Sequence, residues 1–180
     1  MPEPEVVFYF DLASPLAYMA AERVLHAFPG RIVDWWPVLA RDLQGEAPFD
    51  TSQIERLAHE RGLQPLRWPA DFPFDSERAM RVAAYAKSIG RVAPFAQAAF
   101  RQAFAGGRSL ADMDNVLIAA AACEMHPTAV LKGAELRSIR EQLAAATVEA
   151  AQLGVTDVPA VGIDGLVLSG EDALDLVAAT

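Results

Sequence analysis

The sequence predicts an α/β fold in which a β-α-β unit near the start and a β-β-α unit near the end flank a long helical segment. Two observations predict it. Short apolar runs rich in β-branched and aromatic residues lie near both ends of the chain, and apolar residues at helical spacing fill the middle. The 180 residues are enough for one compact domain, or for one domain with a large insertion.

The first unit begins with a buried strand over Val6–Phe10. A helix is expected from Pro15 to about Phe28, where apolar residues recur at helical spacing and Pro29-Gly30 then ends it. Arg31–Pro37 reads as a second strand. Because a helix separates the two strands, we expect them to be parallel.

The last unit contains two short strands, Ala160–Ile163 and Leu166–Ser169. Asp164-Gly165 between them is typical of a tight hairpin turn. Glu171–Ala179 is predicted to form a final helix.

The middle of the chain is predicted to be helical. The expected helices are Ser52–Arg61, Ser76–Ile89, Pro94–Ala105, Met113–Glu124, and one or two helices within Lys132–Leu153. This element order is that of a thioredoxin-like fold with a large all-helical insertion. We therefore assign residues 1–40 and 154–180 to the thioredoxin-like domain and residues 41–153 to a helical insertion domain.

Charge and composition exclude several classes of protein. The net charge of −9 argues against a nucleic-acid surface, which needs a basic face. Residues 41–150 hold 13 of the 15 Lys and Arg and 14 of the 24 Asp and Glu, a net of −1, which leaves −8 for the two ends. No apolar run approaches the roughly 20 residues of a membrane span. The start, MPEPE, lacks the basic residues of a signal peptide, and no metal site is predicted.

The sequence contains one cysteine, Cys123, on an alanine-rich helix. A single thiol forms no internal disulfide, so nothing indicates an oxidising compartment and we expect a cytoplasmic protein. Cys123 is either a small buried filler or a reactive thiol, and both readings stay open.

Ser14-Pro15 stands between the first strand and the first helix. Serine is a preferred N-cap and proline suits the first helical position, so the pair is sufficient to start a helix without any function. The same junction lies at the carboxyl end of a strand, where α/β sheets place ligands and where a helix N-terminus favours an anion. A hydroxyl here can donate to a thiolate. Ser14 is a poor nucleophile itself, because none of the three histidines is spaced to activate it.

Two further motifs lie near the C-terminus. In a thioredoxin-like fold, Val158-Pro159 would carry a cis proline that faces the first helix and turns the Val158 backbone toward an extended peptide. Proline at the start of a strand also has a purely structural explanation. Glu171 and Asp172 follow Gly170 at the start of the last helix, where acids are favoured by the helix dipole alone. Beside the cis proline, the first-turn amides of this helix could instead bind the carboxylate of a γ-glutamyl moiety, and the two acids its ammonium group.

Together these stretches resemble the family of 2-hydroxychromene-2-carboxylate isomerases and kappa-class glutathione transferases, within the DsbA-like branch of thioredoxin folds. The matching segments are FYFDLASPLAYM, WWPV, WPADFPFDSERAMR and GVTDVPAVGIDGLVLSGEDALDLV. Their order and spacing cover essentially the whole chain.

The resemblance implies glutathione as cofactor and a small aromatic molecule as substrate. It implies that Ser14 hydrogen-bonds the glutathione sulfur and stabilises the thiolate. Val158 and Pro159 would hold the peptide backbone, and Glu171 and Asp172 the γ-glutamyl group. On the substrate side it points to Trp68, Phe74 and Asp75. Trp35 and Phe72 are further candidates to line an apolar cleft, although for each of these aromatic residues a place in the core is the favoured reading.

Two departures from the family pattern bear on the substrate. Asp75 stands where the family often has asparagine, and the segment after Trp36 is short and lacks a lysine.

The resemblance makes a glutathione-dependent isomerase of aromatic-compound degradation the first hypothesis for the function of this protein. A kappa-like transferase acting on other electrophiles and a non-catalytic binding module are the alternatives. The resemblance also implies a homodimer, because members of the family are commonly homodimeric.

Overall fold

The computed structural model describes residues 6–45 and 49–179. Its centre is a four-stranded sheet in the order β2-β1-β3-β4. Strands β1 (Val6–Phe10) and β2 (Val33–Pro37) are parallel, whereas β3 (Ala160–Ile163) and β4 (Leu166–Ser169) form an antiparallel hairpin beside β1. This confirms the predicted α/β, thioredoxin-like fold with its helical insertion. The second strand starts two residues later than expected.

The side chains of β1 alternate between two apolar layers. Phe8 and Phe10 face the larger core. There Trp35 of β2 packs edge-on against both rings, with distances between ring centroids of 4.8 Å to Phe8 and 5.7 Å to Phe10. Tyr9 faces a smaller cluster on the opposite side of the sheet, which includes Val158. Trp35 is only 1% exposed, so of the two readings left open for it, cleft or core, the structure shows the core.

The helix predicted from Pro15 to Phe28 is two helices, and the prediction of one is wrong. Helix α1 (Pro15–Ala21) ends where the amide of Arg23 bonds the carbonyl of Ala20, three residues back rather than four. This tighter turn separates α1 from α2 (Val24–Ala27). The apolar spacing continues through the break, so periodicity alone does not show it.

The helical insertion starts with a 3₁₀ turn, η1 (Ala40–Asp42), and continues through α3 (Thr51–Glu60), α4 (Glu77–Ser88) and α5 (Val92–Phe100). A π-helical turn, η2 (Arg101–Ala105), extends α5 and is followed by α6 (Met113–Ala122). Helices α7 (Pro127–Glu135) and α8 (Arg137–Gln152) resolve the open question of one helix or two. They separate at Leu136, whose backbone is extended. Helix α9 (Ala173–Ala178) starts two residues after Glu171.

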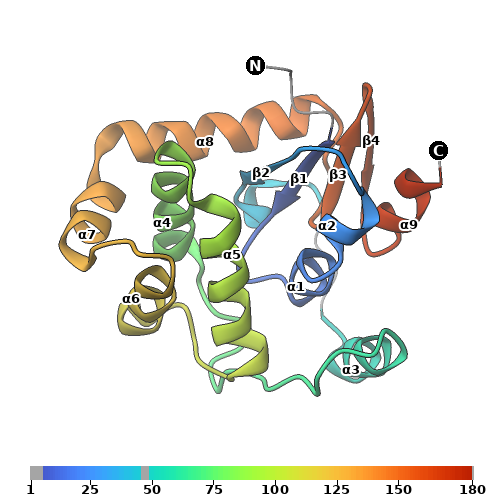
Figure 1. The fold of residues 1–180 in the computed structure, drawn as a ribbon, viewed down its shortest axis with the longest axis horizontal. Helices are drawn as coiled ribbons and strands as arrows, with labels where there is room; N and C mark the ends of the chain where they lie inside the picture. Colours follow the sequence, from blue (N-terminus) through green and yellow to red (C-terminus); the bar gives the residue numbers. More distant parts are fainter. Residues whose placement is uncertain (1–5, 46–48, 180) are drawn as a thin grey trace.

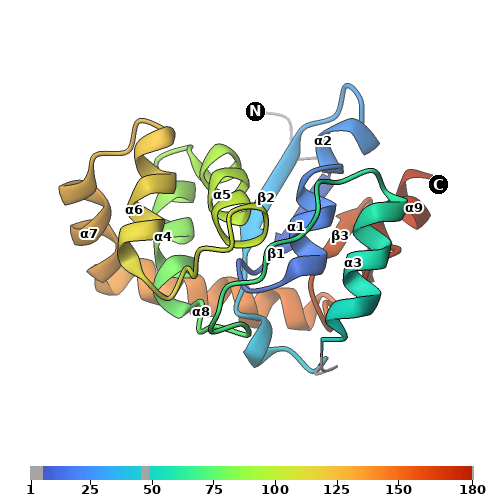
Figure 2. The same cartoon turned by 90° about the horizontal axis from the view of Figure 1, so that it is seen from below.

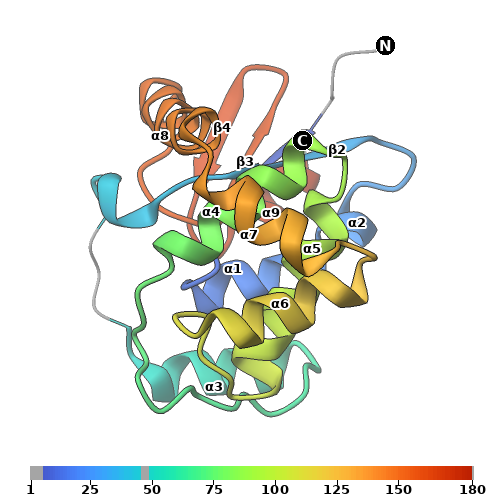
Figure 3. The ribbon, with the colours of Figure 1, turned by 90° about the vertical axis from the view of Figure 1, so that its left-hand side faces the viewer.

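The helices α4 to α7 gather beyond the β2 edge of the sheet, and α8 spans from there back over the sheet (Figures 1 and 3). Seen from below, α3 lies beside α1 and α9, away from this group (Figure 2). One hydrophobic cluster runs from β1 through α1 into α4, α5 and α6. The predicted division into two domains stays a prediction, and this cluster crosses it.

Candidate active site

Ser14 caps helix α1 at the end of the loop that follows β1. Its backbone is extended and its Oγ accepts the amide of Ala17 at 3.1 Å, with Pro15 in the first helical position. The same hydroxyl donates to the carbonyl of Val158 at 3.4 Å, which is long for an O–H···O bond. The side chain is therefore fixed by the helix but only weakly held on its donor side.

Val158 faces Ser14 from the segment before β3, and the Val158-Pro159 bond is cis, as predicted. The Val158 amide already donates to the carboxylate of Asp157 at 2.8 Å. Desolvation raises the pKa of this half-buried carboxyl, and the hydrogen bond from Val158 lowers it in part. A peptide ligand that pairs with the Val158 amide has to displace Asp157 first.

A cavity of about 850 Å³ opens in front of Ser14 and Val158. It brings together five of the sequence-predicted residues, because Phe72, Phe74 and Asp75 line it as well. They come from three segments more than fifty residues apart: the α1 cap, the loop before α4 and the loop before β3. The five are Ser14, Phe72, Phe74, Asp75 and Val158.

One side of the cavity is an aromatic wall formed by Phe49, Phe72 and Phe74. Phe72 packs against Phe49 at 5.4 Å and against Trp68 at 4.7 Å. Trp68 is not one of the lining residues. It backs the wall from behind, and its Nε1 donates to Glu55 at 2.6 Å.

The charged rim of the cavity consists of Arg41, Asp75 and Glu77. Arg41 donates to Glu77 at 2.6 Å and lies 3.6 Å from Asp75. Glu77 also pairs with Arg81 one turn further along α4. The hydrogen bonds from Arg41 and Arg81 lower the pKa of Glu77, so its carboxylate is firmly ionised.

Asp11 is a buried acid in the wall of the same cavity. Its carboxylate accepts the amides of Ala13 and Ala40, both at 2.9 Å, and the hydroxyl of Ser76 at 2.7 Å. Desolvation raises the pKa of Asp11 and these bonds lower it in part. Sequence reasoning missed Asp11, Arg41 and Asp157. An acid placed directly after a buried strand is a pattern that could have identified Asp11.

Glu171 and Asp172 do not line this cavity. The Gly170 amide donates to the Pro159 carbonyl at 2.8 Å, which places the Glu171 segment directly behind the cis proline. Glu171 forms an ion pair with Arg61, the residue directly after α3. Asp172 is exposed at the N-cap of α9 and makes no side-chain cap bond. Glu171 therefore precedes the helix, and the expectation that it lies in the first turn is wrong.

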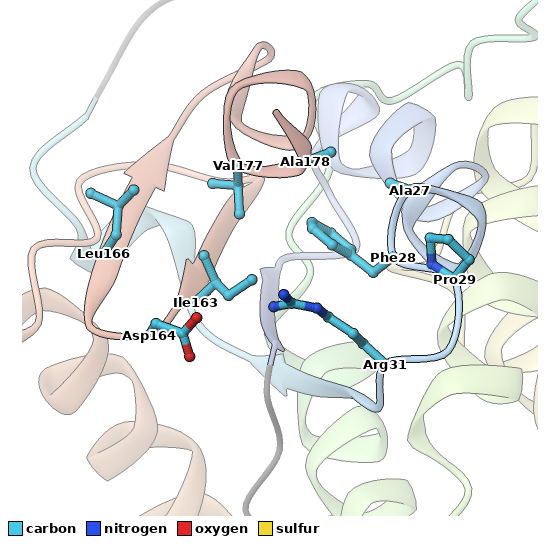
Figure 4. A pocket seen from close by; sticks show the side chains of 9 residues that line it. All are labelled: Ala27, Phe28, Pro29, Arg31, Ile163, Asp164, Leu166, Val177 and Ala178. Carbon is cyan, nitrogen blue, oxygen red and sulfur yellow. The ribbon is translucent and has the colours of Figure 1, made fainter. Parts of the chain in front are cut away.

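A second cavity, of about 420 Å³, lies at the opposite end of the sheet, between α2, the β3–β4 hairpin and α9 (Figure 4). Arg31 and Asp164 point toward it among apolar side chains (Figure 4). It contains none of the predicted site residues. Cys123 is also far from the Ser14 cavity in the fold, since it caps the end of α6 in a buried position. Desolvation raises the pKa of its thiol.

Within residues 6–45 and 49–179, no three or more His, Cys, Asp or Glu side chains gather as metal ligands would. In the same part of the chain, no helix has the length and apolar character of a membrane span.

A family profile of the DsbA-like thioredoxin domain matches residues 5–180. The chain belongs to the DsbA-like thioredoxin family. No curated protein matches its sequence.

Solved structures with this DsbA-like fold include a 2-hydroxychromene-2-carboxylate isomerase, which is 19% identical with a TM-score of 0.85 over 97% of this chain and 92% of the other. A probable DsbA oxidoreductase from Streptomyces coelicolor is 23% identical, with a TM-score of 0.76 over 97% and 86%. The cytosolic disulfide reductase DsbM from Pseudomonas aeruginosa, solved with GSH, is 17% identical, with a TM-score of 0.72 over 97% and 95%. At these identities the likeness shows the fold alone.

Proposed function

We propose that this protein is a glutathione-dependent isomerase of the 2-hydroxychromene-2-carboxylate type, acting on a small aromatic electrophile. The observation that carries the proposal is the position of one hydroxyl. Ser14 lies at the N-terminus of α1, opposite the Val158 carbonyl, and opens into a cavity with an aromatic wall.

The residues around Ser14 fit a bound thiolate. The Ser14 hydroxyl can leave its long contact with Val158 and donate to sulfur, while its own bond from Ala17 keeps the oxygen in place. The N-terminal end of α1 adds a favourable field for negative charge. Both effects lower the pKa of a thiol held here.

The segment around Pro159 fits the rest of a glutathione molecule. The Val158 carbonyl can accept an amide of the peptide, and the Val158 amide is available once Asp157 gives it up. Behind Pro159, Glu171 and Arg61 offer one negative and one positive group, which match the ammonium and carboxylate of a γ-glutamyl end.

When bound, glutathione supplies a sulfur nucleophile that adds reversibly to an activated double bond and so permits rotation about it. The chain's own residues set the geometry. Ser14 holds the sulfur at the mouth of the cavity, and Phe72 and Phe74 offer an apolar surface to the aromatic ring of the substrate.

Dithiol oxidoreduction does not fit this chain, although several proteins of similar fold are named for it. The first helix starts Ser14-Pro15-Leu16-Ala17, where a C-x-x-C pair would be needed. The one cysteine in the sequence, Cys123, is buried at the end of α6.

A kappa-like glutathione transferase is the second candidate, and the charged rim favours it. Asp75 lines the cavity, and Arg41 is already paired with Glu77. A substrate with a carboxylate therefore finds no unpaired positive charge in Arg41 and should bind more weakly than an uncharged electrophile. A non-catalytic binding module is the third reading. A measurement of glutathione binding alone does not separate it from the two enzymes, so turnover has to be measured as well.

Calorimetry with glutathione and with S-methylglutathione tests the proposal, because the second ligand cannot ionise at sulfur. We expect glutathione to bind more tightly as the pH rises and S-methylglutathione to show no such dependence. Turnover of 2-hydroxychromene-2-carboxylate should then require glutathione. Absence of saturable binding at millimolar glutathione would refute both enzyme readings. Binding without turnover of this substrate or of other electrophiles would leave the non-catalytic module.

A further inference from the structure

Asp11 connects three separate segments that line the cavity. Its Oδ1 accepts the Ala13 amide from the α1 cap and the Ser76 hydroxyl from the start of α4. Its Oδ2 accepts the Ala40 amide from the turn after β2. The side chain is 3% exposed, so these contacts are shielded from water.

Each bonded group is next to a residue with a proposed role in the site. Ala13 precedes Ser14, Ala40 precedes Arg41, and Ser76 follows Asp75. We infer that Asp11 is a positioning residue, which fixes the charged rim and the aromatic wall at a set distance from the Ser14 hydroxyl. The inference rests on the proposed function, because it assigns Asp11 a role in placing the electrophile relative to the bound thiol.

The chemistry of the contact explains why a carboxylate stands here. All three partners are donors, so the central group must accept only, and an ionised carboxylate does this with both oxygens. An amide at this position would direct an N–H at one of the three donors and lose that bond. Burial of an acid is costly, and the three bonds offset part of that cost.

The contact from Ala40 can be removed without touching Asp11. Ala40 is the first residue of η1 and Leu39 before it is extended, which is the setting that accepts proline. Ala40→Pro therefore deletes one amide donor and leaves the carboxylate in place. Asp11→Asn is the companion variant, which also deletes the charge.

Thr147→Val is the matched control. The Thr147 hydroxyl accepts the amide of Leu39 at 3.0 Å, so this variant removes a hydrogen bond from the same turn, one residue earlier, without involving Asp11. It reports the effect of loosening the turn in general.

The readout is the ratio of two affinities measured by calorimetry, for S-benzylglutathione and for glutathione. With the sulfur at Ser14, we expect the benzyl group attached to it to contact the aromatic wall, so the ratio measures how well that wall is placed relative to Ser14. We expect Ala40→Pro and Asp11→Asn to lower the ratio by about fivefold, the effect of losing one buried hydrogen bond. Thr147→Val should keep the wild-type ratio.

A stability change alone does not move this ratio, because both ligands bind the same folded protein. The inference is overturned if the folded Ala40→Pro variant keeps the wild-type ratio, or if Thr147→Val lowers it equally. It is also overturned if only Asp11→Asn acts, since Asp11 would then work through its charge. Failure of the wild-type protein to bind either ligand would instead refute the proposed function and this inference with it.

Discussion

The Ser14 hydroxyl has both a structural and a proposed chemical role, and the two can be separated by experiment. As the cap of α1, its oxygen accepts the Ala17 amide. Its proton makes only the long 3.4 Å contact with the Val158 carbonyl, so a stronger acceptor can take it. Ser14→Ala should lose about 1 kcal/mol of unfolding free energy from the cap. It should also raise the pKa of bound glutathione and reduce turnover by tenfold or more, an order-of-magnitude estimate from the loss of a donor to developing charge.

The thiolate ultraviolet absorbance of the glutathione complex, followed across pH, measures the second effect. Asp112→Ala is the control, because Asp112 caps α6 and does not line the cavity, and its loss should cost a similar amount of about 1 kcal/mol. An unchanged thiolate absorbance in Ser14→Ala would argue against the proposed role of the hydroxyl.

Asp11 should make the stability of the protein depend on pH. Burial raises its pKa above the ordinary value of about 4 that it has in the unfolded chain. Between these two values the folded protein holds a proton that the unfolded chain has released. The free energy of unfolding contributed by Asp11 is therefore fully present below the unfolded pKa and falls as the pH rises through the folded pKa.

Urea unfolding of the wild type and of Asp11→Asn over this pH range measures the contribution as a difference between the two proteins. The comparison cancels other groups, including Asp157, whose raised pKa has the same sign. A difference that is flat with pH, or that grows as the pH rises, would contradict the assignment.

Among the elements, the strands were predicted best, because each is a short apolar run bounded by residues that break it. The boundaries of β1, β3 and β4 agree with the sequence-based ranges, and the turn at Asp164-Gly165 was identified from its residue types. The break between α1 and α2 was not predictable. It changes the backbone hydrogen bonding around Arg23 and leaves the apolar spacing intact.

Gly45 connects the turn after β2 to the segment before β3. Its amide donates to the Thr156 carbonyl at 2.7 Å, and a Cβ at this position would lie 2.6 Å from that oxygen. Gly45→Ala should push the two segments apart, lower the unfolding free energy by about 1–3 kcal/mol, and weaken glutathione binding severalfold. Thermal unfolding and calorimetry measure the two effects.

Gly162→Ala is the control for this prediction. It lies in β3, and its added Cβ would meet Val167 at an ordinary contact distance of 3.5 Å. It should change both quantities little. If both substitutions change the unfolding free energy and the glutathione affinity equally, the close approach of Gly45 to Thr156 is not the cause of these effects.

At the scale of the whole molecule, the sequence predicted the Ser14 and Val158 side of the cavity, but not the side formed by Asp11 and Arg41. Ser14 and Val158 were linked because a known fold brings the two motifs together, and the structure places them in contact. Arg41 and Asp11 carry no local motif that points to the cavity. Their position depends on how β2, α4 and α1 pack, which no single segment encodes.

The distribution of charge around the cavity leads to a prediction about the substrate. The protein has a net charge of −9, and among the residues that the structure describes the cavity is lined by three acids and one base, namely Asp11, Asp75, Asp157 and Arg41. Arg41 lies within 4.0 Å of carboxylates of Asp42, Asp75 and Glu77, so its charge is compensated. A carboxylate on the electrophile therefore enters a negative environment.

Under the transferase reading, which the charged rim favours, the kcat/KM for addition of glutathione should be higher with benzalacetone than with benzylidenepyruvate. The two molecules share an aromatic enone, and the second carries a carboxylate in place of a methyl group. Asp75→Asn should raise the relative kcat/KM for benzylidenepyruvate by about threefold, since one negative charge leaves the cavity wall. Asp42→Asn makes the same charge change outside the lining and should have a smaller effect. The gain from Asp75→Asn should shrink as salt is added, because ions screen exposed charges. Equal gains from both variants would show that the general negative charge of the protein, and not Asp75, selects the substrate.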